Sequence, residues 1–333
     1  MKYRFLVLNF ILIISFGCNT ERRFDDNTEL ELLDSIIRTL EGELLPLEKE
    51  ITDLAVFSSL LYAREDSLIS VADKGKYTIG RNDWFYNPNL ANDESTVFIS
   101  LLAPNLAQSV EEVYVTEPLD LEFIKIAGKY PMVAQVYYNT GSQLSRLYPP
   151  YDLVNTIDPD IDVTAFNFYY LGDEVNNPER KRVWVEDIYI DPAGRGWILS
   201  IIHPVYVDNE FKGVLGMDIT LADLMRHFLD KFDESLVIID QDGTIVAGAT
   251  KAIETLSLPP LKNHTYVQTI LADNFRKEDF NLFKSKSKEV RQMVVKFLLE
   301  KEGTFEFNLE GYDYKAYCSK MNLVNWYLIN LKN

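Results

Sequence analysis

Apolar residues return every three or four positions near the start of the chain, from residue 30 onward. This spacing is that of an amphipathic helix or a coiled-coil seam, and it predicts a long helix over residues 30–72. Pro46 lies inside the pattern and should kink or split the helix near Leu45. A dimerisation helix and a helix laid along the protein's own domains both fit, and we favour the second because the seam lasts only about three and a half heptads. The seam consists of Leu30, Leu33, Ile37, Leu40, Leu44, Leu47, Ile51 and Leu54.

Further along, the pattern changes to the alternation of strands. Residues 96–115 first suggest a second helix, or a helix and a turn. Turn residues between alternating stretches then predict β-hairpins. The three hairpins are expected at residues 132–152, turning on Asn139-Thr140-Gly141, at 197–220, turning on Asp208-Asn209-Glu210, and at 235–249, turning on Asp242-Gly243.

The remaining segments complete two similar units. A connecting helix is expected within residues 221–234, polar helices around 277–302, and three closing strands from 303 to 332. Helices therefore flank antiparallel hairpins twice. This order predicts an α+β protein made of two units in series, with the break near residues 221–234.

The first eighteen residues resemble an export signal. Lys2 and Arg4 precede a short apolar run from Phe5 to Phe16, which is too short to span a bilayer comfortably. Gly17 directly before Cys18 is similar to a bacterial lipoprotein signal, in which the cysteine is lipidated and becomes the mature N-terminus. Such signals usually carry leucine three residues before the cysteine, where this chain has Ser15. A plain cleaved signal and an uncleaved anchor remain the alternatives.

Cysteine content agrees with this interpretation. Cys318 is the second of only two cysteines, so lipidation of Cys18 leaves no partner for a disulfide within the chain. Cys318 lies in an alternating stretch and is expected to be a buried strand residue. Residues 19–29 are polar and are expected to be a tether, and no later segment resembles a membrane span.

Charge excludes one class of partner. The formal net charge is −18, and no Lys/Arg stripe typical of phosphate binding is visible, so we expect no nucleic-acid partner. Hydrophobic residues make up 47% of the chain, which is ample for two cores.

No set of residues typical of an enzyme or a metal site is evident. His203, His227 and His264 lie far apart, and neither zinc-binding spacings nor a nucleophile elbow occur. Residues 158–162 resemble the start of a calcium loop, but Val163 replaces its turning glycine and Tyr169 its bidentate glutamate. A pair such as Glu186 and Asp191 is expected by chance among 51 acidic residues. We therefore expect no catalytic residue, no metal and no cofactor.

The stretch VWVEDIYIDPAGRGW, residues 183–197, combines aromatic and acidic residues. With the sequence that follows, it resembles the double Cache domain, a PAS-like extracytoplasmic sensor module of bacterial chemoreceptors and histidine kinases. The resemblance depends on Trp184, on Tyr189 with Asp191, and on the closing Gly-Val-x-Gly-x-Asp-Ile strand at residues 213–219. It implies a long helix over residues 30–72, a membrane-distal unit over 73–220 that holds a ligand, a connecting helix over 221–234, and a membrane-proximal unit over 235–333.

The resemblance also implies ligand-binding residues. Many amine and amino-acid binders of this family use a tyrosine and an aspartate at positions that match Tyr189 and Asp218. An aspartate at a pocket rim can hold an ammonium group, and the rings of Trp184 and Tyr189 offer faces to a cation. The aromatic cluster further upstream corresponds here to residues 166–170, and includes Phe168, Tyr169 and Tyr170.

This cluster departs from the family pattern because it has no arginine to bind a ligand carboxylate. Arg180 or Arg182 could substitute from another direction. Trp184 and Trp197 could instead be core or domain-edge residues, and residues 191–194 are more readily a turn than a site. Asp218 is harder to explain structurally, because an unpaired buried carboxylate is costly.

These patterns predict an extracytoplasmic, membrane-anchored sensor that binds an amine, an amino-acid-like molecule or another small metabolite. Since no output domain follows, ligand occupancy would pass to a separate membrane protein such as a histidine kinase or a chemoreceptor. The expected contacts are therefore a small ligand, the membrane through the lipid on Cys18, and a second copy of the chain in the case that the N-terminal helix dimerises. The alternative is a structural or interaction lipoprotein with a Cache fold and no ligand.

Overall fold

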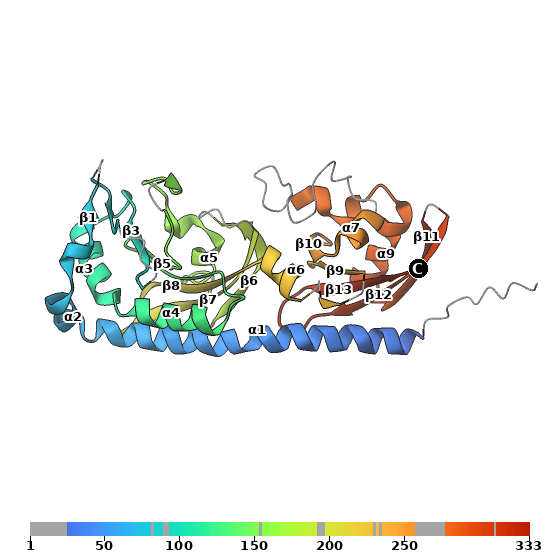
Figure 1. Ribbon diagram of the computed structural model, residues 1–333, viewed down its shortest axis with the longest axis horizontal. Coiled ribbons are helices and arrows are strands. Elements are labelled where there is room, and N and C mark those ends of the chain that lie inside the picture. Colours follow the sequence, from blue (N-terminus) through green and yellow to red (C-terminus); the bar gives the residue numbers. More distant parts are fainter. Residues whose placement is uncertain are drawn as a thin grey trace, which may run out of the picture.

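Two antiparallel sheets lie one after the other along a single long helix in the computed structural model (Figure 1). The fold is α+β with two sheet units in tandem, as the sequence predicts. The signal at residues 1–18, Cys18 and the start of the tether lie outside the described residues, as does the centre of the turn expected at 191–194. The structure describes residues 25–80, 83–88, 93–152, 155–191, 197–228, 231–232, 235–256, 277–309 and 311–333.

The long helix α1 (Asp26–Tyr62) continues through Pro46, so the predicted kink or split is wrong. Proline removes the amide that would bond to the carbonyl of Gly42. Gly42 and Pro46 both face solvent, where water can hydrate that carbonyl, whereas Leu44 and Leu47 beside them are fully buried. Packing of the buried side therefore keeps the helix continuous.

Both ends of α1 differ from the predicted range of 30–72. The helix begins at Asp26 because polar residues expected in the tether pair with the second sheet: Asp26 binds Lys315, and Glu29 binds Lys332. It ends at Tyr62, and a short helix α2 (Glu65–Val71) follows after a break.

The first unit contains an eight-stranded antiparallel sheet with the order β1-β2-β3-β5-β4-β8-β7-β6. Residues 96–99 form a strand rather than the start of the predicted helix. The first two predicted hairpins are confirmed, but the first turns on residues 141–143 rather than on 139–141, because Asn139 and Thr140 still pair within the sheet. The second turns on Asp208 and Asn209, which both have positive φ. The strands are β1 (Thr78–Ile79), β2 (Phe85–Tyr86), β3 (Thr96–Ile99), β4 (Gln135–Thr140), β5 (Leu144–Tyr148), β6 (Val183–Ile190), β7 (Trp197–Val207) and β8 (Glu210–Thr220). The helices are η1 (Lys74–Lys76), α3 (Leu106–Thr116), α4 (Leu119–Lys129), η4 (Val163–Ala165) and α5 (Asn167–Tyr170).

The second unit contains a five-stranded antiparallel sheet with the order β10-β9-β13-β12-β11. Helix α6 (Leu221–His227) connects it to the first unit. The third hairpin and the three closing strands are confirmed, and Cys318 is a buried residue of β12, as predicted. The strands are β9 (Leu236–Ile239), β10 (Ile245–Gly248), β11 (Thr304–Leu309), β12 (Tyr312–Lys320) and β13 (Tyr327–Lys332). The helices are α7 (Thr250–Thr255), η6 (Lys277–Phe280), η7 (Leu282–Lys284) and α9 (Lys288–Leu298).

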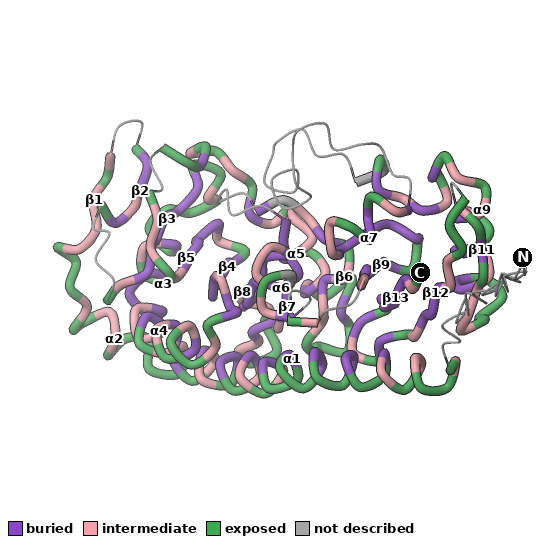
Figure 2. The backbone as a smooth tube through the Cα atoms, turned by 45° about the vertical axis from the view of Figure 1, so that its right-hand side comes forward, coloured by how far each residue is buried: buried purple, intermediate pink, exposed green. Residues whose placement is uncertain are grey.

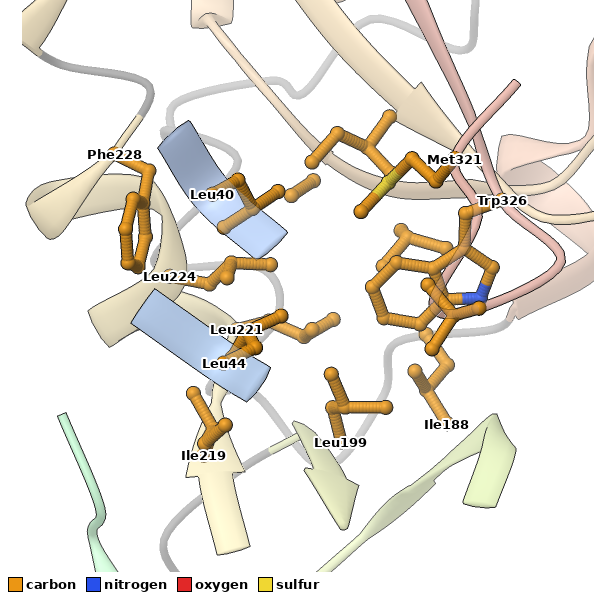
Figure 3. Close-up of a cluster of buried hydrophobic side chains, with 14 of the residues drawn as sticks. Leu40, Leu44, Ile188, Leu199, Ile219, Leu221, Leu224, Phe228, Met321 and Trp326 are labelled. Carbon is orange, nitrogen blue, oxygen red and sulfur yellow. The ribbon is translucent and has the colours of Figure 1, made fainter. Parts of the chain in front are cut away.

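One hydrophobic core extends through both units along the buried side of α1 (Figure 2). At the junction, Trp326 from the loop before β13 lies near Leu199 of β7 and Ile188 of β6, with Leu40 and Leu44 of α1 in the same cluster (Figure 3). The two sheets are therefore packed on a shared core rather than joined only by the chain between them.

Candidate functional site

The two faces of the first sheet have different partners. Along β4, Val136 and Tyr138 face the helices, and the Tyr138 hydroxyl lies 3.0 Å from that of Tyr62 in α1. Gln135, Tyr137 and Asn139 alternate with them and face the other way, toward residues 157–168. This second face carries the site.

A cavity of about 30 Å³ lies between this face and the segment that covers it. Polar side chains come from the sheet, and apolar side chains come mainly from the covering segment. The described residues lining the cavity are Phe98, Gln135, Tyr137, Asn139, Ser145, Leu147, Ile157, Ile161, Val163, Phe166, Phe168, Tyr189, Asp191 and Asp218.

Asp218 forms the centre of the polar wall. Its carboxylate accepts a hydrogen bond from the Ser200 hydroxyl at 2.5 Å, and the Tyr189 hydroxyl lies 3.4 Å from the same oxygen. Tyr189 and Ser200 are themselves 2.7 Å apart. Since the serine proton points to the carboxylate, Tyr189 donates to the serine oxygen. The three side chains thus form one network around a buried negative charge, which explains how the fold tolerates it.

Strand register brings this network together. Asp218 of β8 lies directly opposite Ser200 of β7 and Gln135 of β4. Gly216, two residues earlier on β8, lies opposite Tyr137, and a Cβ at Gly216 would stand 1.9 Å from that ring. Glycine at this position therefore lets the Tyr137 ring lie flat across β8, beside Asp218.

Aromatic rings line the cavity on both sides: Phe166 and Phe168 come from the covering segment, and Tyr137 and Tyr189 come from the sheet. Phe168 lies 5.3 Å from Tyr189 and 5.6 Å from Tyr137, centroid to centroid, and stacks on Phe166 at 5.0 Å. Their faces carry partial negative charge, which favours a cation that has lost its water.

The electrostatics of the site reflect burial and the Asp218 charge. Burial raises the pKa values of Tyr137 and Tyr189 well above their ordinary value, and the negative charge of Asp218 raises both further. Both hydroxyls therefore stay protonated at physiological pH and act as neutral hydrogen-bonding groups.

Asp191 was missed as a site residue, because residues 191–194 were interpreted as a turn. Its side chain is 4% exposed and lines the cavity together with Asp218. A signal for this was present in the sequence: Asp191 follows Tyr189 by two positions, and residues two apart on a strand share a face. Gln135, Tyr137, Asn139 and Ser200 were also missed, since only strand pairing places them beside Asp218.

Three of the six predicted ligand-binding residues line the cavity, and three do not. Asp218, Tyr189 and Phe168 are brought together. Trp184 lies on the helix side of the sheet and donates to Glu48 of α1 at 3.2 Å. Strand β6 is irregular between Val185 and Tyr189, but the register pairs Trp184 with Ile201 and Tyr189 with Ile198. These partners are three residues apart on β7, so the two rings lie on opposite faces of the sheet.

The other two predicted residues lie next to the cavity wall but point away from it. Tyr169 is buried against Phe211 at 5.8 Å, and Tyr170 is 40% exposed. Both follow Phe168 on α5, whose helical turn spreads successive side chains in different directions.

Neither arginine suggested as a substitute reaches the cavity. Arg182 pairs with Glu48 of α1, and Arg180 stacks over Tyr206 at 4.1 Å. Arg146 of β5 is fully buried, yet alternation turns it away from its neighbours Ser145 and Leu147, and it pairs with Asp120 of α4 at 2.6 Å.

The segment that covers the cavity is attached to the sheet near its middle by Asp162. Its carboxylate accepts hydrogen bonds from Thr164 and from Gln143, which follows β4. These hydrogen bonds lower the pKa of Asp162. The acidic residues that resemble a calcium loop thus include one that caps η4. Within the described part of the chain, no three His, Cys, Asp or Glu side chains are grouped to hold a metal ion.

Comparison of the whole chain with known proteins identifies its fold. No family model matches the sequence, and no curated protein matches it. The ligand-binding domain of the Pseudomonas fluorescens chemoreceptor CtaA, solved with L-alanine, matches 92% of this chain and 96% of its own at 13% identity, with a TM-score of 0.53. The fold is that of a double Cache domain.

A second chemoreceptor supports the same assignment. The ligand-binding domain of PctB from Pseudomonas aeruginosa, solved with L-Gln, matches 92% of this chain and 90% of its own at 14% identity, with a TM-score of 0.50. Each match covers far more of this chain than either sheet unit alone. Among the described residues, no helix of this protein has the length and apolar character to cross a bilayer.

Proposed function

We propose that the protein is an extracytoplasmic, lipid-anchored sensor that binds a small organic molecule carrying a cationic amino group. The first Cache unit, residues 73–220, would hold this ligand and the second, residues 235–333, would lie nearer the membrane. The observation that carries the proposal is the Asp218 carboxylate, held by Ser200 and Tyr189 in the wall of the cavity.

The chemistry of the wall favours an ammonium group. An ammonium has three N–H donors, and Asp218, Asp191 and Asn139 offer acceptor oxygens from one side. The rings of Phe168 and Tyr189 would contact its positive charge. Both chemoreceptor domains named above were solved with amino acids, which carry the same group.

Gln135 gives the cavity a donor as well. Its side chain is 2% exposed, and its Nε2 has no hydrogen-bond partner among the described residues. A ligand oxygen could accept from it, so an amino-acid-like molecule fits here without an arginine. A neutral donor binds a carboxylate more weakly than arginine does. Simple amines therefore remain in the proposed ligand class.

Binding requires the covering segment to move. A cavity of about 30 Å³ has room for one or two water molecules, far less than an amino acid needs. Outward movement of residues 155–168 would enlarge it without breaking a strand pair of the sheet. Because α1 contacts both sheets, a change in the first unit could reach the second, and from there a separate membrane protein such as a histidine kinase or chemoreceptor.

A thermal-shift screen of amines, amino acids and small carboxylates tests the proposal on the chain from Asn19 onward. We expect at least one compound with an amino group to raise the unfolding temperature, since a ligand at 100 times its dissociation constant adds about 2.7 kcal/mol to the free energy of unfolding. Asp218→Asn keeps the shape of the side chain, removes its charge, and should abolish the shift.

Two variants serve as controls. Glu179→Gln makes the same chemical change at an exposed ion pair with Lys181, and Trp184→Phe changes an aromatic residue on the opposite side of the sheet. Both should retain the shift. If no compound stabilises the wild-type chain, the ligand-free structural lipoprotein becomes the better interpretation.

A further inference from the structure

A short basic segment stands out in a strongly acidic chain. Between residues 281 and 299 there are five basic residues and one acidic residue, Glu289, although the whole chain has a net charge of −18. Lys284, Lys286 and Lys288 alternate with Ser285 and Ser287 in the sequence KSKSK.

The backbone separates these lysines from the serines. Ser285 is buried and donates to the Leu256 carbonyl at 3.0 Å, and Ser287 caps α9 by accepting from the Val290 amide at 3.2 Å. The hydrogen bonds of the two serines turn their side chains toward the protein, and the lysines on either side of them are left outside. Lys284, Lys286 and Lys288 are exposed, and none forms an ion pair within the part of the chain that the structure describes.

Arg291 and Glu289 hold this segment in place. The Arg291 guanidinium donates to the carbonyls of Ser285 and Lys286, which are neutral, and among the described residues it forms no ion pair. Glu289 accepts from the Ser287 hydroxyl at 2.8 Å at the start of α9. A surface groove next to it is lined by Lys288, Arg291 and Phe305 among other residues. We call Lys284, Lys286, Lys288 and Arg291 the basic surface.

The basic surface lies at the end of the molecule where α1 begins. In both views α9 and β11 lie at the end of the molecule where α1 begins (Figures 1 and 2). Gly303 lies between α9 and β11, and a Cβ placed on it would stand 3.5 Å from the Leu30 side chain of α1. Asp26, the first residue of α1, is eight residues from Cys18, which limits their separation to about 28 Å.

We propose that the basic surface contacts the anionic phospholipid headgroups of the membrane that anchors the chain. An anchor at Cys18 or in the preceding apolar run places this end within reach of the bilayer. The positive charge of the basic surface would then turn this face toward the lipid, and the net negative charge of the rest of the chain would keep the first unit away from it. Basic clusters next to a membrane anchor typically act in this way.

Vesicle sedimentation of the chain from Asn19 onward tests this proposal without an anchor. We expect binding to vesicles of phosphatidylglycerol and phosphatidylcholine in equal amounts at low salt, no binding to phosphatidylcholine alone, and loss of binding at high salt. The triple variant Lys284→Gln/Lys286→Gln/Lys288→Gln should weaken the partition coefficient about 100-fold, since each lysine contributes about fivefold at an anionic surface.

A second triple variant matches the change in charge. Lys49→Gln/Lys125→Gln/Lys181→Gln alters three exposed lysines of α1 and the first unit, and should bind like the wild type. Equal loss in both triple variants, binding that persists at high salt, or no binding of the wild type to anionic vesicles would each overturn the proposal. The ligand screen is independent of these outcomes, because none of the three substituted residues lines the cavity.

Discussion

At the scale of single residues, the first unit contains a second carboxylate with its own network, Glu112 of α3. It accepts hydrogen bonds from Tyr62 of α1 at 2.5 Å, from Thr140 at 3.0 Å, and from Ser142. Unlike Asp218 it lies on the helix side of the sheet, away from the cavity. Burial raises the pKa of Glu112 despite these hydrogen bonds, because the charged form has lost much of its water.

This shift predicts how Glu112 affects stability with pH. The folded state binds the Glu112 proton more tightly than the unfolded state does, so its contribution is fully present below pH 4.5 and is lost as the pH rises through the folded-state pKa. Glu112→Gln removes this dependence. In urea unfolding, the free energy of unfolding of the variant minus that of the wild type should therefore increase between pH 4 and pH 7.

The neighbouring variant Glu111→Gln is the control, because Glu111 is exposed on the same helix. It should give the wild-type pH profile. A constant difference between Glu112→Gln and the wild type across this range would show that the Glu112 charge is not destabilised by the fold.

At the scale of elements, α1 shows how packing overrides a local signal. A proline inside a helix costs about 3 kcal/mol relative to alanine, and this proline was expected to break the helix. The helix persists because residues on its buried side contact strands of both sheets, including β7, β8 and β12. A break at Pro46 would separate that side from one of its two sheets.

The cost of Pro46 should therefore still be present and measurable. Pro46→Ala restores the amide donor to the Gly42 carbonyl, and we expect it to raise the free energy of unfolding by about 1–3 kcal/mol in guanidinium unfolding. Glu43→Ala, also exposed on α1, should change it by less than about 0.5 kcal/mol. A loss of stability in Pro46→Ala would mean that the proline ring makes contacts that the helix needs.

At the scale of the whole molecule, the two Cache units share one folded core. The loop between β12 and β13 is held by α1 and β6: Glu41 accepts from the amides of Asn322 and Leu323, and Glu186 accepts from Asn325. Trp326, 1% exposed, fills the space between these elements. Movement of the first sheet would thus press on the second through packed side chains.

Removing this contact should uncouple the units. Trp326→Ala leaves a cavity at the junction and should lower the free energy of unfolding by about 3–5 kcal/mol. We expect its denaturant transition, followed by circular dichroism, to separate into two steps, because each sheet retains its own inner contacts.

Trp84→Ala provides the comparison, since Trp84 is 4% exposed and packs only within the first unit, against Tyr86 and Phe98. It should lose stability without creating a second step that involves the second unit. A single transition in Trp326→Ala would show that α1 alone couples the two sheets.

The sequence by itself determined the elements that depend on local patterns. The seam of α1, the hairpins and the closing strands could be predicted, because periodicity and turn residues act over only a few positions. Asp218 stood out for the same reason, as an acid within an apolar strand.

Tertiary structure decided the features that depend on pairing between distant segments. Helix α1 passes Pro46 and begins at Asp26 because two sheets hold it, and Ser200, Gln135 and Tyr137 join Asp218 only through the register of β4, β7 and β8. Trp184 was predicted to bind the ligand but faces α1, whereas Asp191 was predicted to belong to a turn but lines the cavity. The elements that pack on each face of the sheet decide this. A sequence states which residues share a face, but only the folded sheet shows which face meets the helix and which meets the cavity.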